Sequence, residues 1–127
     1  MTEKNIVPKE ATCEIEVAFN VIGGKWKPMI LWFLYEFGTL RFGQLQHLIP
    51  DITHNILTKQ LRALEDNKVI SRKVYPEIPL KVEYSITSTG RDILPALEIM
   101  CDWASKNNYF GYDLKHNLCD VEDSVDS

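Results

Sequence analysis

The hydrophobic period of this 127-residue chain changes near residue 67. Before it, Leu57, Leu61 and Leu64 recur at the i, i+4, i+7 spacing of a helix that buries one face. After it, apolar and polar residues alternate from Val82 to Ile86, which is the period of a half-buried strand. The two patterns together predict helices and a small sheet around one core.

Two helices are predicted before this point. The first follows a cap at Thr12 and ends at the adjacent glycines 23 and 24. The second begins near Pro28, continues to about Phe37 and is apolar nearly all round, which predicts a central, buried helix. The stripe that defines the first helix has helical spacing and comprises Ile15, Ala18, Phe19 and Ile22.

The rest of the chain completes a recognisable order of elements. A helical stretch FGQLQHLI stops at Pro50, and a helix capped by Thr53 follows after the short connection PDI, which predicts a helix-turn-helix. The segment VISRKVY and the alternating strand then form an antiparallel hairpin with the tip PEIPLK. A last helix starts near Ser88, with a kink at Pro95. This order predicts a mainly α fold with a small β hairpin, the winged helix.

Length and composition favour a single domain. A chain of this length with 45% hydrophobic residues can build a core without disulfides or metal. No apolar run reaches the 18 residues of a membrane span, and the N-terminus lacks a leader pattern, so we expect a cytoplasmic protein. We expect residues 1–12 to form a flexible arm, residues 13–112 the domain, and residues 113–127 an acidic, disordered tail.

The net charge of −4 conceals a basic segment. The five acids and one lysine from Asp113 onward account for the whole negative balance. Between Thr53 and Tyr75, five bases stand against two acids. This local excess of positive charge is compatible with a nucleic-acid partner.

The helix after Thr53 presents a polar face opposite its leucine row. At about 100° per residue, Asn55, Thr58, Lys59 and Arg62 cluster there, with His54 at the flank. Asn can pair with adenine, and Lys or Arg with guanine, in a major groove. A solvated helix face is the simpler interpretation of this helix alone, but the hairpin that follows favours DNA binding.

The hairpin adds candidate phosphate contacts. Arg72 lies at its base and Lys81 near its tip, where a wing meets the flanking backbone or minor groove. Arg41, at the entry of the preceding helix, is a third candidate. Glu77 and Glu83 on the same hairpin weaken the positive character.

Several motifs resemble the HxlR-type winged-helix transcriptional regulators of bacteria, which are MarR-like. They are GGKWK, LRFGQL, LTKQLRALE and VYPEIPLKVEYSIT, within a match from about Cys13 to Ala104. The resemblance implies a homodimer joined by the first and last helices, bound to a palindromic operator in double-stranded DNA at the nucleoid. His54 and Asn55 stand where the family commonly has Gln followed by Lys or Arg, so the operator sequence does not carry over.

The three cysteines are widely spaced without a CxxC pair, which predicts thiols. Many family members have a cysteine just before the first helix, and in a subset it senses oxidants or electrophiles. Cys13 is therefore a candidate redox sensor, although the alternative is a small residue packed in the dimer interface. We expect Cys101 in the core and Cys119 exposed in the tail, open to an intersubunit disulfide.

Other functions have weaker support in the sequence. A winged helix used only for protein contacts is the main alternative, favoured by the overall acidity. His116 and Cys119 lack the further ligands of a metal site, and no cofactor is expected. The three tryptophans are more typical of core and interface than of a ligand pocket. Asp51 and His54 lack a nucleophile or a paired carboxylate, so we do not expect an enzyme.

Overall fold

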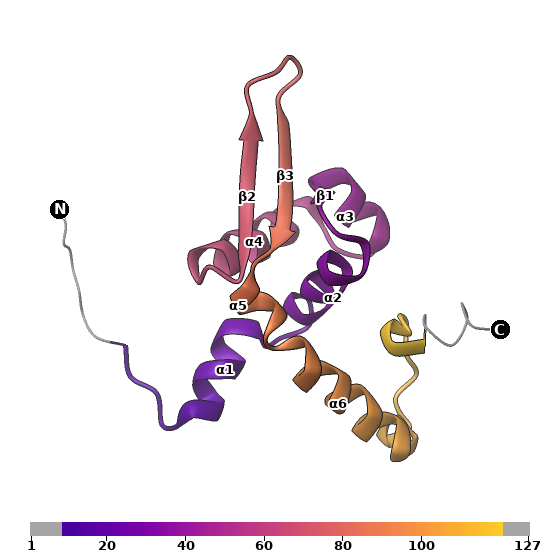
Figure 1. Ribbon diagram of the computed structural model, residues 1–127. Helices are drawn as coiled ribbons and strands as arrows, with labels where there is room; N and C mark the ends of the chain where they lie inside the picture. Colours follow the sequence, from indigo (N-terminus) through magenta and orange to yellow (C-terminus); the bar gives the residue numbers. More distant parts are fainter. Residues whose placement is uncertain (1–8, 121–127) are drawn as a thin grey trace.

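The computed structural model describes residues 9–120 and shows a winged helix with two halves (Figure 1). The upper half in that view holds the helix-turn-helix and a long hairpin, and α1 and α6 form the lower half. The helices are α1 (Glu14–Ile22), α2 (Lys27–Phe37), α3 (Phe42–Leu48), α4 (His54–Asp66), α5 (Ser88–Arg91) and α6 (Leu94–Lys106), with short 3₁₀ turns η1 (Asn108–Gly111) and η2 (Leu118–Asp120). The predicted fold class is confirmed.

The sheet has three antiparallel strands in the order β1-β3-β2. Strand β2 (Ile70–Tyr75) and strand β3 (Lys81–Ile86) form the predicted hairpin, which we call the wing. Strand β1 (Leu40–Arg41), expected only as an extended segment, pairs with β3 so that Leu40 faces Tyr84. The hydroxyls of Thr39 and Ser85 are 2.8 Å apart beside this pairing. The wing is thereby anchored to the chain segment that leads into α3.

One hydrophobic core joins the helices to the base of the wing. Ile30, Leu31 and Leu34 of α2 are almost fully buried, which confirms that this helix is central. Gly38 ends α2, and its φ of 81° is the left-handed conformation that favours glycine. Leu57, Leu61 and Leu64 of α4 pack into the same core. The position of α4 is therefore set by α2 and by the start of β2, with which it shares contacts.

Three local predictions are wrong. The cap of α1 is Cys13 and not Thr12. The last helix is two helices, because α5 ends at Arg91 and α6 begins at Leu94. Pro95 therefore does not kink a helix; it lies in the first turn of α6, where its missing N–H is not needed.

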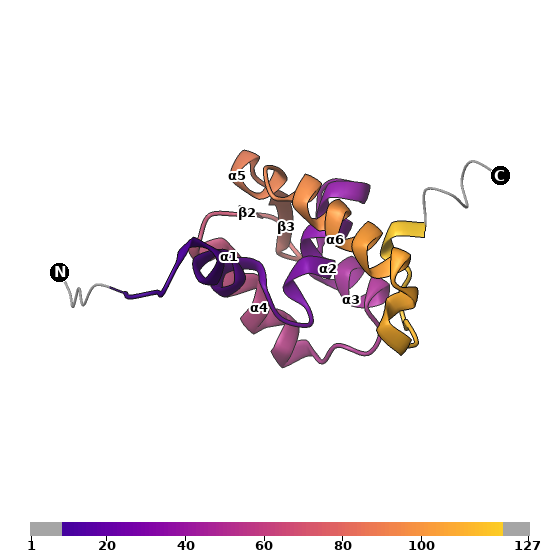
Figure 2. The same cartoon turned by 90° about the horizontal axis from the view of Figure 1, so that it is seen from below.

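The segment after η1 also differs from expectation. The composition predicts disorder for residues 113–120, yet the segment returns along α6 (Figure 2). Leu118 and Cys119 are half-buried against the core. The remainder of the predicted tail, residues 121–127, and residues 1–8 of the predicted arm lie outside the described residues. The domain boundaries themselves stay a prediction.

Candidate nucleic-acid interface

Helix α4 is fixed by its buried leucine row and by its cap. Leu57 and Leu64 are fully covered, and Leu61 is 2% exposed. The Oγ1 atom of Thr53 accepts a hydrogen bond from the backbone N–H of Ile56 at 3.2 Å, so the predicted cap is present. Because the row points inward, the opposite side of the helix must face outward.

Three of the predicted base-contacting residues lie on that outward side. Asn55, Lys59 and Arg62 are all exposed. Within residues 9–120, no hydrogen bond or ion pair engages their side chains. Their donors are therefore available to a partner along one face of α4.

Two other predicted contacts are partly engaged within the chain. Thr58 is half-buried, and its hydroxyl donates a hydrogen bond to the backbone carbonyl of His54 at 2.9 Å. The His54 ring lies against Phe42 of α3, with 4.6 Å between the ring centroids. His54 therefore also links the two helices of the helix-turn-helix. The structure places both residues at the edge of the outward face.

The predicted cations of the wing have acidic neighbours. At the base of the wing, Nε of Arg72 lies 3.4 Å from Oε1 of Glu65, and this ion pair connects the wing to the end of α4. Nζ of Lys81 lies 3.6 Å from Oε2 of Glu83 and 4.7 Å from the centre of the Tyr75 ring. All of these groups remain partly exposed, so such pairs stabilise the wing only weakly. They hold the cations along the wing without covering them.

Strand pairing brings Arg41 to the same side of the molecule. Arg41 is exposed at the start of α3, and its backbone N–H donates to Oε1 of Gln44 at 2.8 Å. In the sheet its Cα is opposite that of Glu83. The predicted phosphate contacts thus come from three segments, and β3 lies between the other two.

Two groups in this half have displaced pKa values. Burial raises the pKa of Tyr84 on β3, Glu65 adds to the rise, and the positive charges of Arg72 and Arg62 oppose it. For Asp51, in the turn of the helix-turn-helix, burial raises the pKa. Hydrogen bonds and the charges of His116 and Lys115 lower the pKa by more, so that it lies below its usual value. Tyr84 therefore stays neutral, and Asp51 stays ionised, over a wider range of pH.

The two helices of the lower half expose apolar faces. Phe19 of α1 is 55% exposed and Trp103 of α6 is 61% exposed. These faces, which we call the apolar faces of α1 and α6, comprise Ile15, Phe19, Ile99, Met100 and Trp103. Cys13 is also exposed, at the start of α1, and its side chain makes no capping hydrogen bond.

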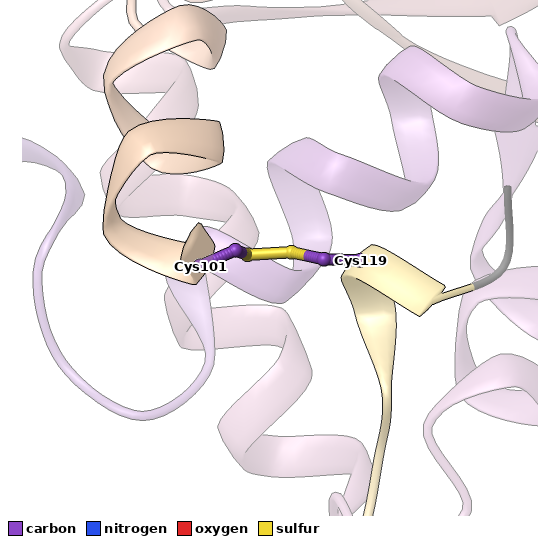
Figure 3. Close-up of a disulfide and its surroundings, with 2 residues drawn as sticks. All are labelled: Cys101 and Cys119. Atoms are coloured by element: carbon purple, nitrogen blue, oxygen red, sulfur yellow. A yellow bond between two sulfur atoms is a disulfide. The ribbon is translucent and has the colours of Figure 1, made fainter. Parts of the chain in front are cut away.

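Cys101 packs against the core as expected, but the prediction that Cys101 and Cys119 are free thiols is wrong. Cys101 of α6 and Cys119 of η2 form a disulfide, and both are half-buried (Figure 3). Cys119 is therefore neither in an exposed tail nor available to a second chain in this state. In addition, Nε2 of His116 is 3.3 Å from Oδ1 of Asp51. Sequence patterns missed both links because their partners are 18 and 65 residues apart.

Other kinds of site find little support in the part of the chain that is described. Across residues 9–120, there is no group of three or more His, Cys, Asp or Glu side chains that could hold a metal ion. No helix among these residues is long and apolar enough to span a bilayer. Trp32 is buried in the core, which agrees with its interpretation as a core residue, whereas Trp26 is half-buried and Trp103 is exposed.

Comparison with known proteins identifies the family. A model described as "HxlR-like helix-turn-helix" matches residues 21–110, which include the helix-turn-helix and the wing. The chain belongs to the HxlR-like family. An HTH-type transcriptional regulator of Methanothermobacter thermautotrophicus is 47% identical over 94 residues, or 74% of this chain and 71% of that protein. YybR of Bacillus subtilis, also an HTH-type transcriptional regulator, is 40% identical over 105 residues, or 83% of each chain.

Solved structures of similar regulators share the fold. The redox regulator HypR in its oxidised form superposes with a TM-score of 0.70 at 37% identity, covering 80% of this chain and 100% of HypR. Reduced YodB of B. subtilis, a transcriptional regulator, gives a TM-score of 0.67 at 33% identity, covering 76% of this chain and 94% of YodB. The predicted class, a transcriptional regulator and not an enzyme, is confirmed by these relatives.

Proposed function

We propose that this HxlR-like regulator acts as a homodimer on a palindromic site in double-stranded DNA, in the cytoplasm at the nucleoid. The observation that carries the proposal is the outward face of α4, where Asn55, Lys59 and Arg62 stand exposed opposite a fully buried leucine row. An α-helix with this face fits a major groove. Two such helices related by a two-fold axis would enter successive grooves about 34 Å apart.

The residues of the interface divide into two roles. Asn55, Lys59 and Arg62 contact bases, and Thr58 and His54 at the edge of α4 support them or contact the adjacent backbone. Thr53 contributes as the helix cap, near the positive end of the helix dipole where a phosphate binds well. The phosphate contacts come from the sheet and are Arg41, Arg72 and Lys81. Their acidic neighbours Glu65 and Glu83 reduce the strength of these contacts and do not cover them.

The apolar faces of α1 and α6 support the two-fold assembly. Phe19, Ile99 and Trp103 leave more than half of their surface open to solvent in one chain. Large exposed apolar side chains on two helices are typical of protein interfaces. A second copy of the chain that covers them would place one α4 on each side of the axis.

Cys13 is the proposed redox-sensitive residue of this function. It is exposed, and it is the one cysteine of the described residues outside the disulfide. HypR is described as a redox regulator, and YodB has been solved after diamide treatment, which favours an oxidant or electrophile as the effector. In protein whose Cys101–Cys119 disulfide is already formed, diamide is expected to change the DNA affinity of the wild type, whereas Cys13→Ser in the same state does not respond. Equal responses of the two proteins would remove Cys13 from this role.

Binding to DNA is tested directly with selected and random duplexes. DNA selected from a random library by the full chain is titrated by fluorescence anisotropy at 50 and 200 mM salt. We expect tight binding to the selected duplex, weaker binding to a random duplex, and loss of affinity for both as salt rises. A winged helix that binds only protein would instead select no consensus and show no salt-dependent association.

A further inference from the structure

The C-terminal segment, defined here as residues 112–120, is tied to the rest of the chain at two points. Near its end, Cys119 is bonded to Cys101 of α6. Near its middle, His116 contacts Asp51 in the turn between α3 and α4. The segment therefore bridges a helix of the lower half and the turn that precedes α4.

Cys101 and Cys119 are close enough to form a disulfide, and both line a cleft that is open to solvent. The Cα atoms of Cys101 and Cys119 are 6.3 Å apart, within the range of protein disulfides. Both residues line an open cleft of about 600 Å³ between α1, α2, α6 and the C-terminal segment. A small reactant can thus approach the bond without unfolding of the core.

The contact between His116 and Asp51 depends on the disulfide between Cys101 and Cys119. Residues 113–117 form no helix or strand, and their side chains are mainly exposed. The contact between His116 and Asp51 is a partly exposed pair at 3.3 Å, which alone stabilises by little. The disulfide supplies the restraint that keeps His116 beside the turn, because it limits how far residue 116 can move.

We propose that Cys101 and Cys119 form a reversible thiol–disulfide site that clamps the C-terminal segment onto the turn of the helix-turn-helix. The oxidant is a low-molecular-weight disulfide, RSSR. One cysteine, as thiolate, attacks RSSR and forms a mixed disulfide, which releases one thiolate RS⁻. The second cysteine loses its proton and attacks the mixed disulfide, which forms the Cys101–Cys119 bond and releases a second RS⁻. The protein loses two electrons and two protons, and the reactant leaves as two RSH molecules.

The clamp links a redox state to the helix that contacts DNA, and this consequence rests on the proposed function. In the oxidised protein, His116 lies against the Asp51 carboxylate, two residues before the Thr53 cap. In the reduced protein, the segment departs and leaves that carboxylate facing DNA phosphates. Reduction should therefore weaken DNA binding. Cys13 has no part in this device.

The clamp is tested without DNA in the full chain carrying Cys13→Ser. The protein is reduced with dithiothreitol or oxidised with glutathione disulfide, and alkylation by iodoacetamide is counted by mass spectrometry. Hydrogen–deuterium exchange is followed in residues 112–120 and 49–56. We expect two alkylations after reduction, none after oxidation, and exchange several-fold faster in both segments of the reduced form.

Two variants make the result decisive. Cys119→Ser in the same background should exchange like the reduced protein under both conditions. His116→Ala should retain the disulfide but lose the protection of residues 49–56. Two alkylatable thiols after oxidation, a disulfide formed between chains, or identical exchange in both redox states would each overturn the proposal.

A separate measurement addresses DNA. In the Cys13→Ser background, the dissociation constant for the selected duplex should rise on the order of two- to fivefold on reduction. A change of this size matches the free energy that one partly exposed charge pair contributes. Asp51→Asn should abolish the difference, because no carboxylate is left to repel phosphate. If hydrogen–deuterium exchange responds to redox state but the dissociation constants of the reduced and oxidised proteins are equal, the link to DNA binding is overturned while the clamp stands. If no variant binds DNA, the proposed function fails while the alkylation result still decides the clamp.

Discussion

In α4 the apolar row is fully covered by the same chain, whereas the apolar faces of α1 and α6 lie open to solvent. The upper half of the molecule thus completes its own packing and presents a polar, basic face. The lower half leaves large apolar side chains exposed to solvent; Trp103, for example, is 61% exposed. The difference indicates that one chain suffices to build the proposed DNA-contacting surface, and it supports the proposal that a second copy covers the lower half.

The largest expected effect comes from the lower half. Trp103→Glu should raise the dimer dissociation constant about a thousandfold. A central aromatic residue contributes on the order of 2 kcal/mol to the free energy of association. In a two-fold dimer the residue occurs once in each subunit, so the substitution removes this contribution twice. Sedimentation velocity over a range of protein concentrations measures the change.

The matched control for this substitution is Ile78→Glu. Ile78 is a fully exposed apolar residue in the connection between β2 and β3. This tip of the wing lies far from α1 and α6 (Figure 1). It should leave self-association unchanged. Loss of the dimer in both variants, or in neither, would contradict the assignment of the apolar faces of α1 and α6 to the interface.

The next largest effect comes from the covered row of α4. Leu61→Ala should lower the free energy of unfolding by about 2–5 kcal/mol, because it removes buried methyl groups and leaves a cavity. Urea denaturation followed by tryptophan fluorescence measures the loss. Ile78→Ala, at the exposed tip, should change stability by less than about 0.5 kcal/mol. A loss below 1 kcal/mol for Leu61→Ala would mean that α4 does not depend on this row.

The outward face of α4 should affect binding and not folding. Arg62→Ala should weaken binding to the selected duplex by about 1–3 kcal/mol and relax selectivity at one base pair of each half-site. Anisotropy titrations against single-base variants of the duplex measure both effects. Arg91→Ala, at an exposed position on α5, serves as the control. Equal affinities of wild type and Arg62→Ala would exclude Arg62 from base contact.

The wing should contribute to affinity without selectivity. Lys81→Ala should weaken binding to all duplexes alike and flatten the slope of log affinity against log salt by about one unit for each copy of the chain. Lys106→Ala, at the end of α6, is the matched control. A sequence-dependent effect of Lys81→Ala would show that the residue contacts bases.

The smallest effect is the pH dependence of Tyr84 at the base of the wing. Burial raises its pKa in the folded state, so the folded protein binds the phenol proton more tightly than the unfolded chain does. Its contribution to stability is fully present below the ordinary tyrosine pKa of about 10 and is lost as pH rises through the raised value. Urea denaturation between pH 9 and 11.5 should show a steeper loss for wild type than for Tyr84→Phe. Parallel losses would contradict the assignment.

Most of the upper half could be predicted from the sequence because its signals are local. The leucine spacing gives α4, Thr53 gives its start, and the alternation from Val82 gives β3. The pairing of β1 with β3 could not be predicted, since Leu40 and Arg41 are too few to show a period. Pro95 was assigned to a kink because proline in a helix is compatible with either a kink or a first turn, and only the position of α5 decides between them.

The links of the C-terminal segment could not be predicted for a different reason. The approach of Cys119 to Cys101 and of His116 to Asp51 depends on the path of the chain after α6. Near residues 108–110 the backbone takes positive φ at Asn108, Tyr109 and Phe110, and it turns back along the helix. Neither cysteine spacing nor composition encodes that reversal, and the acidity of the last residues favoured disorder instead.

A hydroxyl-radical footprint of the full chain on its selected duplex tests whether two copies of α4 enter DNA together. Two copies of α4 related by a two-fold axis predict two protected half-sites, centred about 10 base pairs apart, with matching patterns on the two strands. Protection of a single half-site, or an asymmetric pattern that persists at saturation, would contradict the two-fold arrangement of α4 on DNA.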